Sequence, residues 1–233
     1  MTLIVCCYTS TGIALSGDSR ATGVQTQQVQ QTGSGQQVTV QIPWVLSDSA
    51  RKVFCIAERY ALATWGEAFI GDLPIAHHVN EFALSLKNAV PPTTETFADT
   101  LLARFRALAP AANLGFVAAG YDSSAPYVYE VQIAQNTKKR WNVDQATGAL
   151  QYGVFYGGDW DIVQRLLNAP NTTPAIGLLN LQDAVDLTRH LIRTTIDQMR
   201  FDPRFASVGG HIDTITLTPS RTRFLVRKEL HAS

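Results

Sequence analysis

The chain has 233 residues, of which 45% are hydrophobic and 16% are charged, a composition typical of one globular domain over residues 1–233. Basic and acidic residues number 19 each, which excludes the basic excess of proteins that bind nucleic acid or an anionic membrane surface. The sequence has no charged leader followed by a long apolar stretch, and no later run reaches the roughly 18 apolar residues of a membrane span. We therefore expect a cytoplasmic protein with neither nucleic acid nor membrane as a partner.

The cysteines and histidines do not follow the spacing of metal ligands. Cys6 and Cys7 are adjacent in a predicted strand and so point to opposite faces, and Cys55 makes the count odd. The five histidines lack an HExxH or similar pattern. We expect buried free thiols in a reducing compartment, and neither a metal nor a cofactor.

The first part of the chain predicts two hairpins. Residues 2–8 and 13–16 are β-branched and apolar, and a turn separates them. Residues 24–43 alternate weakly around Thr32-Gly33-Ser34-Gly35, which predicts an extended hairpin inserted into the domain. The glutamine content of this stretch is also compatible with a floppy, low-complexity loop.

The middle of the chain predicts a second strand pair followed by two helices. Residues 52–57 and 60–65 have strand composition. Apolar residues then follow helical spacing over 67–89, up to Pro91-Pro92. Thr93 or Thr94 can cap the next helix, which ends before Pro110.

The remaining part repeats this order of strands and helices. Strands are predicted over 114–119, 127–133 and 140–143, helices over 159–168 and 181–201, and closing strands over 211–217 and 223–227. Each face of a sheet needs a cover, so two antiparallel sheets between two helical layers is the expected packing. The sequence thus predicts an α+β fold, a four-layer αββα sandwich.

Thr2 is the first candidate for chemistry. A threonine hydroxyl is a weak nucleophile unless a base takes its proton, and removal of Met1 would place a free α-amine on the same residue. An α-amino group titrates near pH 8, so a neighbouring cation would leave it neutral and basic at physiological pH. Many proteins nevertheless begin with Met-Thr for no chemical reason, so the context of Thr2 decides.

Five short motifs, the first of which begins at Thr2, occur in an order that resembles a known family. They are Thr2-Leu-Ile-Val, Gly17-Asp18-Ser19-Arg20-Ala21-Thr22, Ala50-Arg51-Lys52-Val53-Phe54, Gly66 with Gly71-Asp72 behind it, and Gly209-Gly210-His211-Ile212-Asp213. Together they cover essentially the whole chain and resemble proteasome-type N-terminal nucleophile hydrolases, particularly the catalytic β subunits and their bacterial homologues. Each motif alone is weak, whereas the steps from Thr2 to Asp18 and from Lys52 to Gly66 are more specific.

The resemblance implies roles for four charged or hydroxyl side chains. Thr2 would supply the attacking Oγ and the general base, Lys52 would be the matching lysine, and Asp18 its carboxylate partner. An ammonium near Thr2 lowers the pKa of its amine and hydroxyl, and a carboxylate keeps the lysine in place. Arg20 would brace Asp18 or the backbone around it. Taken singly, each of these residues could equally be a turn or surface residue.

The resemblance also implies a place for substrate. Gly66 would stabilise the oxyanion through its backbone N–H, although a plain turn would also favour glycine there. Strand alternation predicts that Trp65 turns away and packs beneath the helices. Thr22 would pair its backbone with an extended peptide. Ala21, Thr64 and Ala68 would line a roomy, uncharged side-chain pocket, which Ala50 and Phe54 could narrow.

Two expected support residues are missing. The family commonly has a serine where this chain has Gly157-Gly158, and an aspartate a few residues before Gly209-Gly210, where this chain has Arg204-Phe205-Ala206-Ser207-Val208. Ser207 or Asp202 could substitute. These departures bear on proton transfer around Thr2.

The sequence thus predicts a threonine-type peptidase that acts on peptides or unfolded proteins within a homo-oligomer. Two alternatives keep the fold. One is a catalytically silent structural subunit, which would explain the missing support residues, and the other is an acylase for small amides. Cleavage preference, ring size and any unfoldase partner are not specified by the sequence.

Overall fold

The computed structural model describes residues 2–30, 37–168 and 174–228. Ten strands form two five-stranded antiparallel sheets. The first sheet has the order β12 (Gly153–Gly158), β1 (Leu3–Tyr8), β2 (Ile13–Asp18), β13 (Ile212–Thr218) and β14 (Arg221–Val226). The second has the order β11 (Thr137–Arg140), β10 (Ala125–Gln132), β9 (Leu114–Asp122), β6 (Tyr60–Gly66) and β5 (Val53–Ile56).

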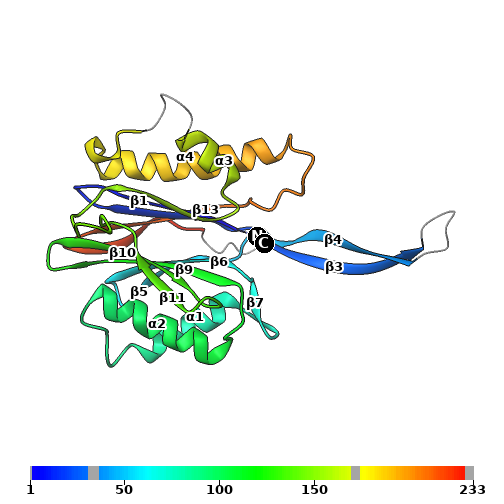
Figure 1. Ribbon diagram of the computed structural model, residues 1–233, viewed down its shortest axis with the longest axis horizontal. Coiled ribbons are helices and arrows are strands. Elements are labelled where there is room, and N and C mark those ends of the chain that lie inside the picture. Colours follow the sequence, from blue (N-terminus) through cyan, green and yellow to red (C-terminus); the bar gives the residue numbers. More distant parts are fainter. Residues whose placement is uncertain (1, 31–36, 169–173, 229–233) are drawn as a thin grey trace.

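The helices lie on opposite sides of these sheets (Figure 1). α1 (Ile75–Ser85) and α2 (Thr94–Leu108) share a buried apolar cluster with the second sheet. α3 (Asp161–Leu167) and α4 (Leu181–Met199) share another with the first sheet, and a short 3-10 helix, Ile176–Leu178, precedes α4. The α+β class predicted from the sequence is confirmed.

Successive side chains of β1 point to opposite faces and enter different hydrophobic clusters. Leu3 and Val5 of β1 pack against α3 and α4, whereas Ile4 and Cys6 enter a cluster that holds side chains of both sheets. Cys7 packs beside α4, so the two adjacent thiols do point to opposite faces, as expected. The β1 strand is buried along its whole length because both of its faces are covered.

Two predicted elements were wrong in their bounds, and one strand was missed. The helix expected over 67–89 begins only at Ile75, because a small hairpin, β7 (Phe69–Ile70) and β8 (Leu73–Pro74), precedes it. The positive φ of Gly71, 58°, makes the tight turn of that hairpin. β12 was not predicted, and the strand expected over 140–143 ends at Arg140.

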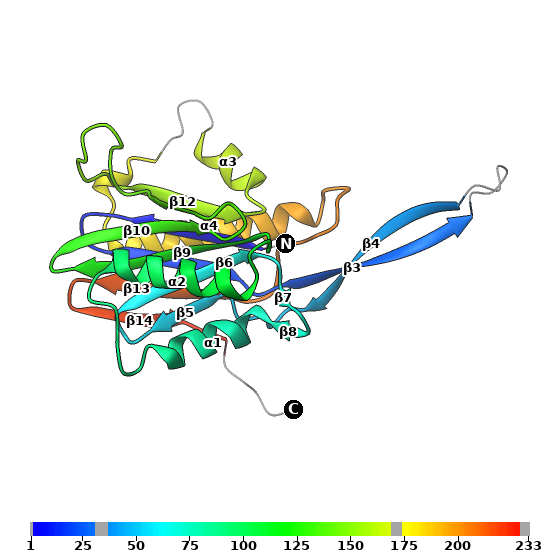
Figure 2. The same ribbon diagram turned by 60° about the horizontal axis from the view of Figure 1, so that its bottom comes forward.

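A two-stranded ribbon projects from the body of the molecule (Figures 1 and 2). It consists of β3 (Ala21–Gln30) and β4 (Gln37–Ser47), which pair antiparallel and form a sheet of their own. The turn expected at 32–35 lies outside the described residues. Throughout the described ranges, every helix is too short or too polar to cross a membrane.

Candidate active site

The buried carboxylate of Asp18 connects four backbone and side-chain donors at the end of β2. Its Oδ1 accepts hydrogen bonds from Lys52 Nζ at 2.8 Å and from the backbone N–H of Leu3 at 2.9 Å. Its Oδ2 accepts from the N–H groups of Arg20 and Gly209, at 3.1 and 3.0 Å. One side chain therefore joins the residue after Thr2 to the lysine and to the Gly209-Gly210 loop.

Lys52 is held just before β5 and is 5% exposed. Its ammonium also donates to the carbonyl of Arg20, and its own carbonyl accepts from the N–H of Thr64 at 3.0 Å, which ties it to β6. Burial lowers the pKa of Lys52, and the Asp18 carboxylate opposes that shift. A buried ammonium with a lowered pKa is suited to influence a neighbouring proton transfer.

Thr2 is buried at the start of β1, where it is fixed from the side opposite Asp18. Its carbonyl accepts a hydrogen bond of 2.7 Å from the N–H of Asp159, and the next residue, Leu3, pairs with Gly158. Gly158 has a φ of 95°, and a Cβ there would collide with the Thr2 carbonyl oxygen. The glycine at 158 therefore allows the β12 end to approach Thr2 closely.

A second buried polar group lies beside Thr2. The Ser207 hydroxyl, fully buried, donates to Asp159 Oδ2, and Arg204 contacts Asp159 Oδ1 at 3.1 Å. Asp202, the other expected substitute, pairs with Arg204 instead, at 3.2 Å. Sequence reasoning identified Ser207 but missed Asp159, whose position directly after Gly157-Gly158 was its only signal.

Arg20 contacts the site through its backbone, not through its side chain. Its guanidinium forms a two-armed pair with Asp48, with distances of 2.7 and 2.9 Å, and donates to the carbonyl of Ala206 at 3.0 Å. The guanidinium thus contacts the backbone at Ala206 and pairs with Asp48, not with Asp18. Asp48 was missed because nothing local in the sequence connects it with residue 20.

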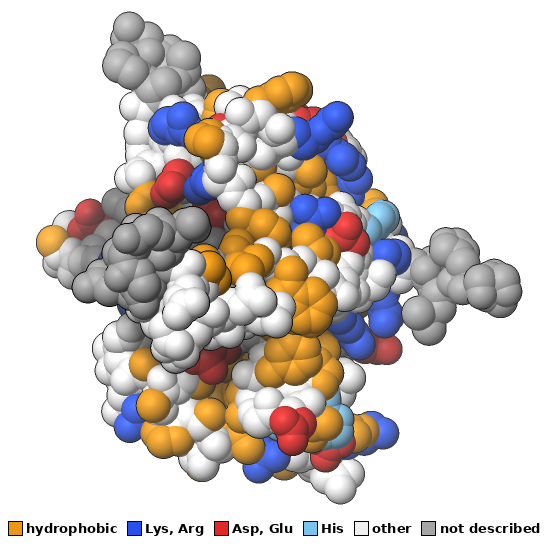
Figure 3. Space-filling model, turned by 90° about the vertical axis from the view of Figure 1, so that its right-hand side faces the viewer, with side chains coloured by type: hydrophobic (Ala, Val, Ile, Leu, Met, Phe, Trp, Pro, Cys, Tyr) orange, Lys and Arg blue, Asp and Glu red, His pale blue; other side chains and the backbone are white. Residues whose placement is uncertain are grey.

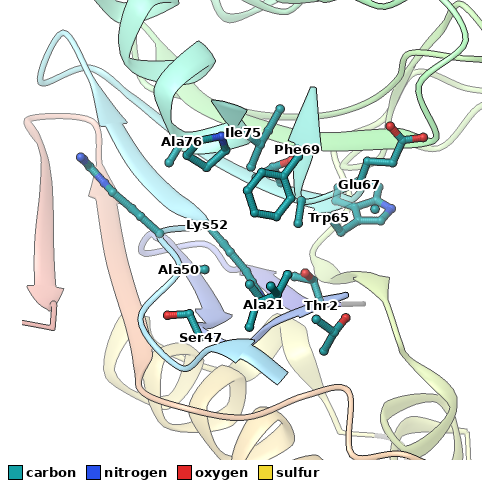
Figure 4. A pocket seen from close by; sticks show the side chains of 17 residues that line it. Thr2, Ala21, Ser47, Ala50, Lys52, Trp65, Glu67, Phe69, Ile75 and Ala76 are labelled. Carbon is teal, nitrogen blue, oxygen red and sulfur yellow. The ribbon is translucent and has the colours of Figure 1, made fainter. Parts of the chain in front are cut away.

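A cavity of about 380 Å³ opens beside Thr2 (Figure 4). Figure 4 shows Lys52 extending toward the end of the cavity where Thr2 and Ala21 lie. Every residue predicted to bind substrate lines this cavity: Ala21, Thr22, Ala50, Thr64 and Ala68. The charged residues Arg51, Lys52 and Glu67 line it as well, so the expectation of an uncharged pocket was wrong. Sequence reasoning did not identify the other apolar side chains of the cavity, which are Leu46 at the end of β4 and, on the far wall, Phe69, Pro74, Ile75 and Ala76.

Trp65 departs from its predicted position. It packs among the side chains between the two sheets, with its ring centroid 5.6 Å from that of Phe155, and it also lines the cavity. Alternation along β6 does turn Trp65 away from Thr64, but that face lies between the two sheets and not beneath the helices, and Gly115 and Gly157, which carry no side chains, leave room for the indole there. Trp65 therefore belongs to the cavity wall.

Gly66 ends β6 at the cavity with a φ of 98°. A Cβ at this position would collide with the carbonyl oxygen of Asn113 on the neighbouring strand connection. That carbonyl accepts from the N–H of Glu67 at 3.0 Å, and Glu67 Oε1 accepts from the N–H of Asn113 at 2.9 Å. Glycine is thus required here by the backbone alone, whatever its chemical role.

Comparison of the sequence with models of known protein families finds no match, and comparison with curated proteins finds none either. Within the described residues, no three histidine, cysteine, aspartate or glutamate side chains are grouped as metal ligands would be. Function is therefore inferred from the geometry around Thr2.

Proposed function

We propose that this chain is a threonine-type peptidase that uses Thr2 as its nucleophile after removal of Met1. The two sheets and their helices support assignment to the four-layer αββα fold of N-terminal nucleophile hydrolases. The proposed substrate is a peptide or an unfolded protein, and the proposed working form is a homo-oligomer. No cofactor enters the proposed reaction.

The observation that carries the proposal is the double role of Asp18 Oδ1. One oxygen accepts from Lys52 Nζ and from Leu3 N–H, so the lysine and the residue after the nucleophile are fixed by the same buried atom. A buried ion pair of this kind is weak evidence for stability, because desolvation costs about as much as the pair gains. It is better explained as a device that positions a charge beside Thr2.

The chemistry proceeds in two steps. Thr2 Oγ attacks the peptide carbonyl, its proton passes to the Thr2 amine, and the protonated amine then gives that proton to the leaving amine as the C–N bond breaks. Water then attacks the resulting ester on Thr2, and the same amine accepts a proton from the water and returns it to Thr2 Oγ as the C–O bond breaks. Lys52 lowers the pKa of the Thr2 amine, and the Gly66 N–H is the proposed oxyanion donor.

The apolar far wall of the cavity supports a preference for substrates with an apolar side chain beside the scissile bond. Phe69 and Ile75 face the cavity with Leu46, and small residues leave the space between them open. At about 380 Å³ the cavity is large enough for a bulky side chain. The same features would also accept the acyl group of a small amide, which keeps the acylase alternative open.

Intact mass and turnover test the proposal. The purified protein is expected to lack Met1 and to hydrolyse short peptides with apolar side chains and an unstructured protein, and Thr2→Ala is expected to abolish both activities. Thr2→Ser, which keeps a hydroxyl, is the matched control and should retain activity. Retention of Met1 with no turnover would favour the silent structural subunit, whereas turnover of small amides alone would favour the acylase.

A further inference from the structure

The ribbon β3–β4 has two unlike faces. Opposite residues of an antiparallel pair lie on the same face, and the register joins Val29 with Val38, Gln27 with Val40, Gln25 with Ile42 and Gly23 with Trp44. This set, the apolar face, contains Val29, Val38, Val40, Ile42 and Trp44. The other face carries Thr26, Gln28, Thr39 and Gln41 along its outer half, and Val24, Pro43 and Val45 near its base.

All five hydrophobic side chains of the apolar face are exposed, from 39% at Val40 to 50% at Trp44. Trp44 lies across β3 at Gly23, where a Cβ would meet the indole. A two-stranded ribbon is marginally stable in water by itself, and hydrophobic side chains gathered along one of its faces, here with Gln25 and Gln27 between them, mark a surface that another molecule covers. The ribbon projects away from the body, so its own domain does not cover that face (Figures 1 and 2).

The charge of the segment restricts the occupant. From Ala21 to Ser47 the sequence has no Asp, Glu, Lys, Arg or His, and the whole chain has a formal net charge of zero. A nucleic acid, an anionic lipid surface or a charged peptide would find no complementary group here. Two copies of this chain, by contrast, meet without net repulsion.

The area of the apolar face favours a second copy. The nine pairs from Thr22–Val45 to Gln30–Gln37 make a face about 30 Å long and 10 Å wide, or about 300 Å². Packing one ribbon on a partner buries about 600 Å² in total, which is too little for a stable complex. Two copies that exchange ribbons bury about 1,200 Å², which reaches the size of specific interfaces.

The body offers an apolar surface that can receive a ribbon. Phe69 and Leu73, 40% and 45% exposed, lie on the β7–β8 hairpin beside the base of the ribbon (Figures 1 and 2). Figure 3 shows hydrophobic side chains gathered in a band on the face from which the ribbon projects. Both a donor surface and a receiving surface are therefore present on one chain.

We propose that the apolar face of the β3–β4 ribbon docks on a second copy of this chain, with the two copies exchanging ribbons. This inference rests on the proposed homo-oligomer and adds the surface that forms it. Leu46 and Ser47, at the end of β4, line the cavity beside Thr2, so the docked ribbon would also fix one cavity wall.

The test places the same two charges on either face of β4. Val40→Lys with Ile42→Lys puts them on the apolar face, and Thr39→Lys with Gln41→Lys, the matched control, puts them on the opposite face. Size-exclusion chromatography with light scattering measures the assembly. Wild type and control are expected to assemble alike, and the apolar-face variant to dissociate at least a hundredfold more readily, because two buried side chains are lost from each copy.

Each other outcome overturns the proposal. If all three proteins assemble equally, the oligomer forms through a surface other than the apolar face of the ribbon. If both lysine variants dissociate equally, the added charge and not the apolar face causes the dissociation. If the wild-type protein is a monomer, a second copy of this chain does not cover the ribbon. Acylation of Thr2 tests the proposed peptidase activity independently of this result. If circular dichroism shows that the lysine variant is misfolded, Val40→Thr with Ile42→Thr should weaken assembly in the same direction.

Discussion

Replacing Lys52 by methionine removes the ammonium from the buried pair while keeping most of the side-chain volume. Lys52 and Asp18 are 6% and 0% exposed at their side chains, so the change leaves a carboxylate in the interior without its counterion. Loss of one partner of a buried pair costs about 3–5 kcal/mol. We expect about 3 kcal/mol, the lower end, because three backbone N–H groups still donate to Asp18.

Denaturant unfolding of wild type, Lys52→Met, Asp18→Asn and the double variant measures this cost. Asp18→Asn should cost more, about 5 kcal/mol, because its amide nitrogen faces donors that the carboxylate satisfied. The double variant should cost about 3 kcal/mol less than the sum of the single changes, which is the coupling of the pair. In thermal unfolding, Lys52→Met should lower the midpoint by about 6–12 °C.

The exposed Lys87 provides the control, because Lys87→Met removes a charge in solvent and should change the free energy of unfolding by less than about 0.5 kcal/mol. Additive effects of the Lys52 and Asp18 changes would refute the reasoning, since independent residues do not form the pair on which it depends. Turnover provides the second measurement, and Lys52→Met should reduce kcat by about a hundredfold or more.

Three further outcomes follow from the surroundings of Thr2 and from burial. Gly158 has a φ of 95° and lies against the Thr2 carbonyl, so Gly158→Ala should cost more stability than Gly148→Ala, where φ is 71° and the space is open. Gly158→Ala should also slow acylation of Thr2 by at least tenfold. Equal effects of the two changes in unfolding and acylation assays would contradict the contact. Ser207→Ala should lower the free energy of unfolding by about 1–3 kcal/mol because Asp159 loses a buried donor, and an unchanged denaturation midpoint would show that the hydroxyl is not needed. Burial raises the pKa of the Cys7 thiol from 9.0 to about 12, so above pH 9 the unfolded chain loses a proton that the folded protein keeps. This contribution to stability is complete below pH 9 and is lost as pH rises toward 12. Cys7→Ala should therefore reduce the fall in the free energy of unfolding over this range by about 1.4 kcal/mol per pH unit. Parallel profiles of stability against pH for wild type and Cys7→Ala would contradict this prediction.

Local patterns in the sequence were enough to predict most of the strands and helices. In β1, hydrophobic residues occupy both faces of the strand. Glycines mark the turns at Gly12 and Gly209-Gly210, which lie next to strand ends. β12 escaped because three of its six residues are glycine, which gives it weak strand propensity. It is a strand through its pairing with β1, a contact that no local pattern encodes.

The candidate site divides in the same way. Asp18, Lys52 and the small residues of the cavity could be found because their order and spacing resemble a known family. Asp48 and Asp159 could not be found from the sequence, because each contacts the site through a residue far away in the chain. Asp48 pairs with Arg20, and Asp159 accepts a hydrogen bond from Ser207. The carboxylate beside Ser207 comes from residue 159, and the stretch 204–208, where an aspartate was expected, contains none.

Covalent labelling of Thr2 tests the central claim most directly. The wild-type protein is incubated with a peptide epoxyketone or a β-lactone, and the adduct is mapped by mass spectrometry beside a proteasome control. We predict a single adduct on Thr2, absent in Thr2→Ala and much slower in Lys52→Met. An unlabelled Thr2 under conditions that modify the control, or label on another residue, would contradict the account.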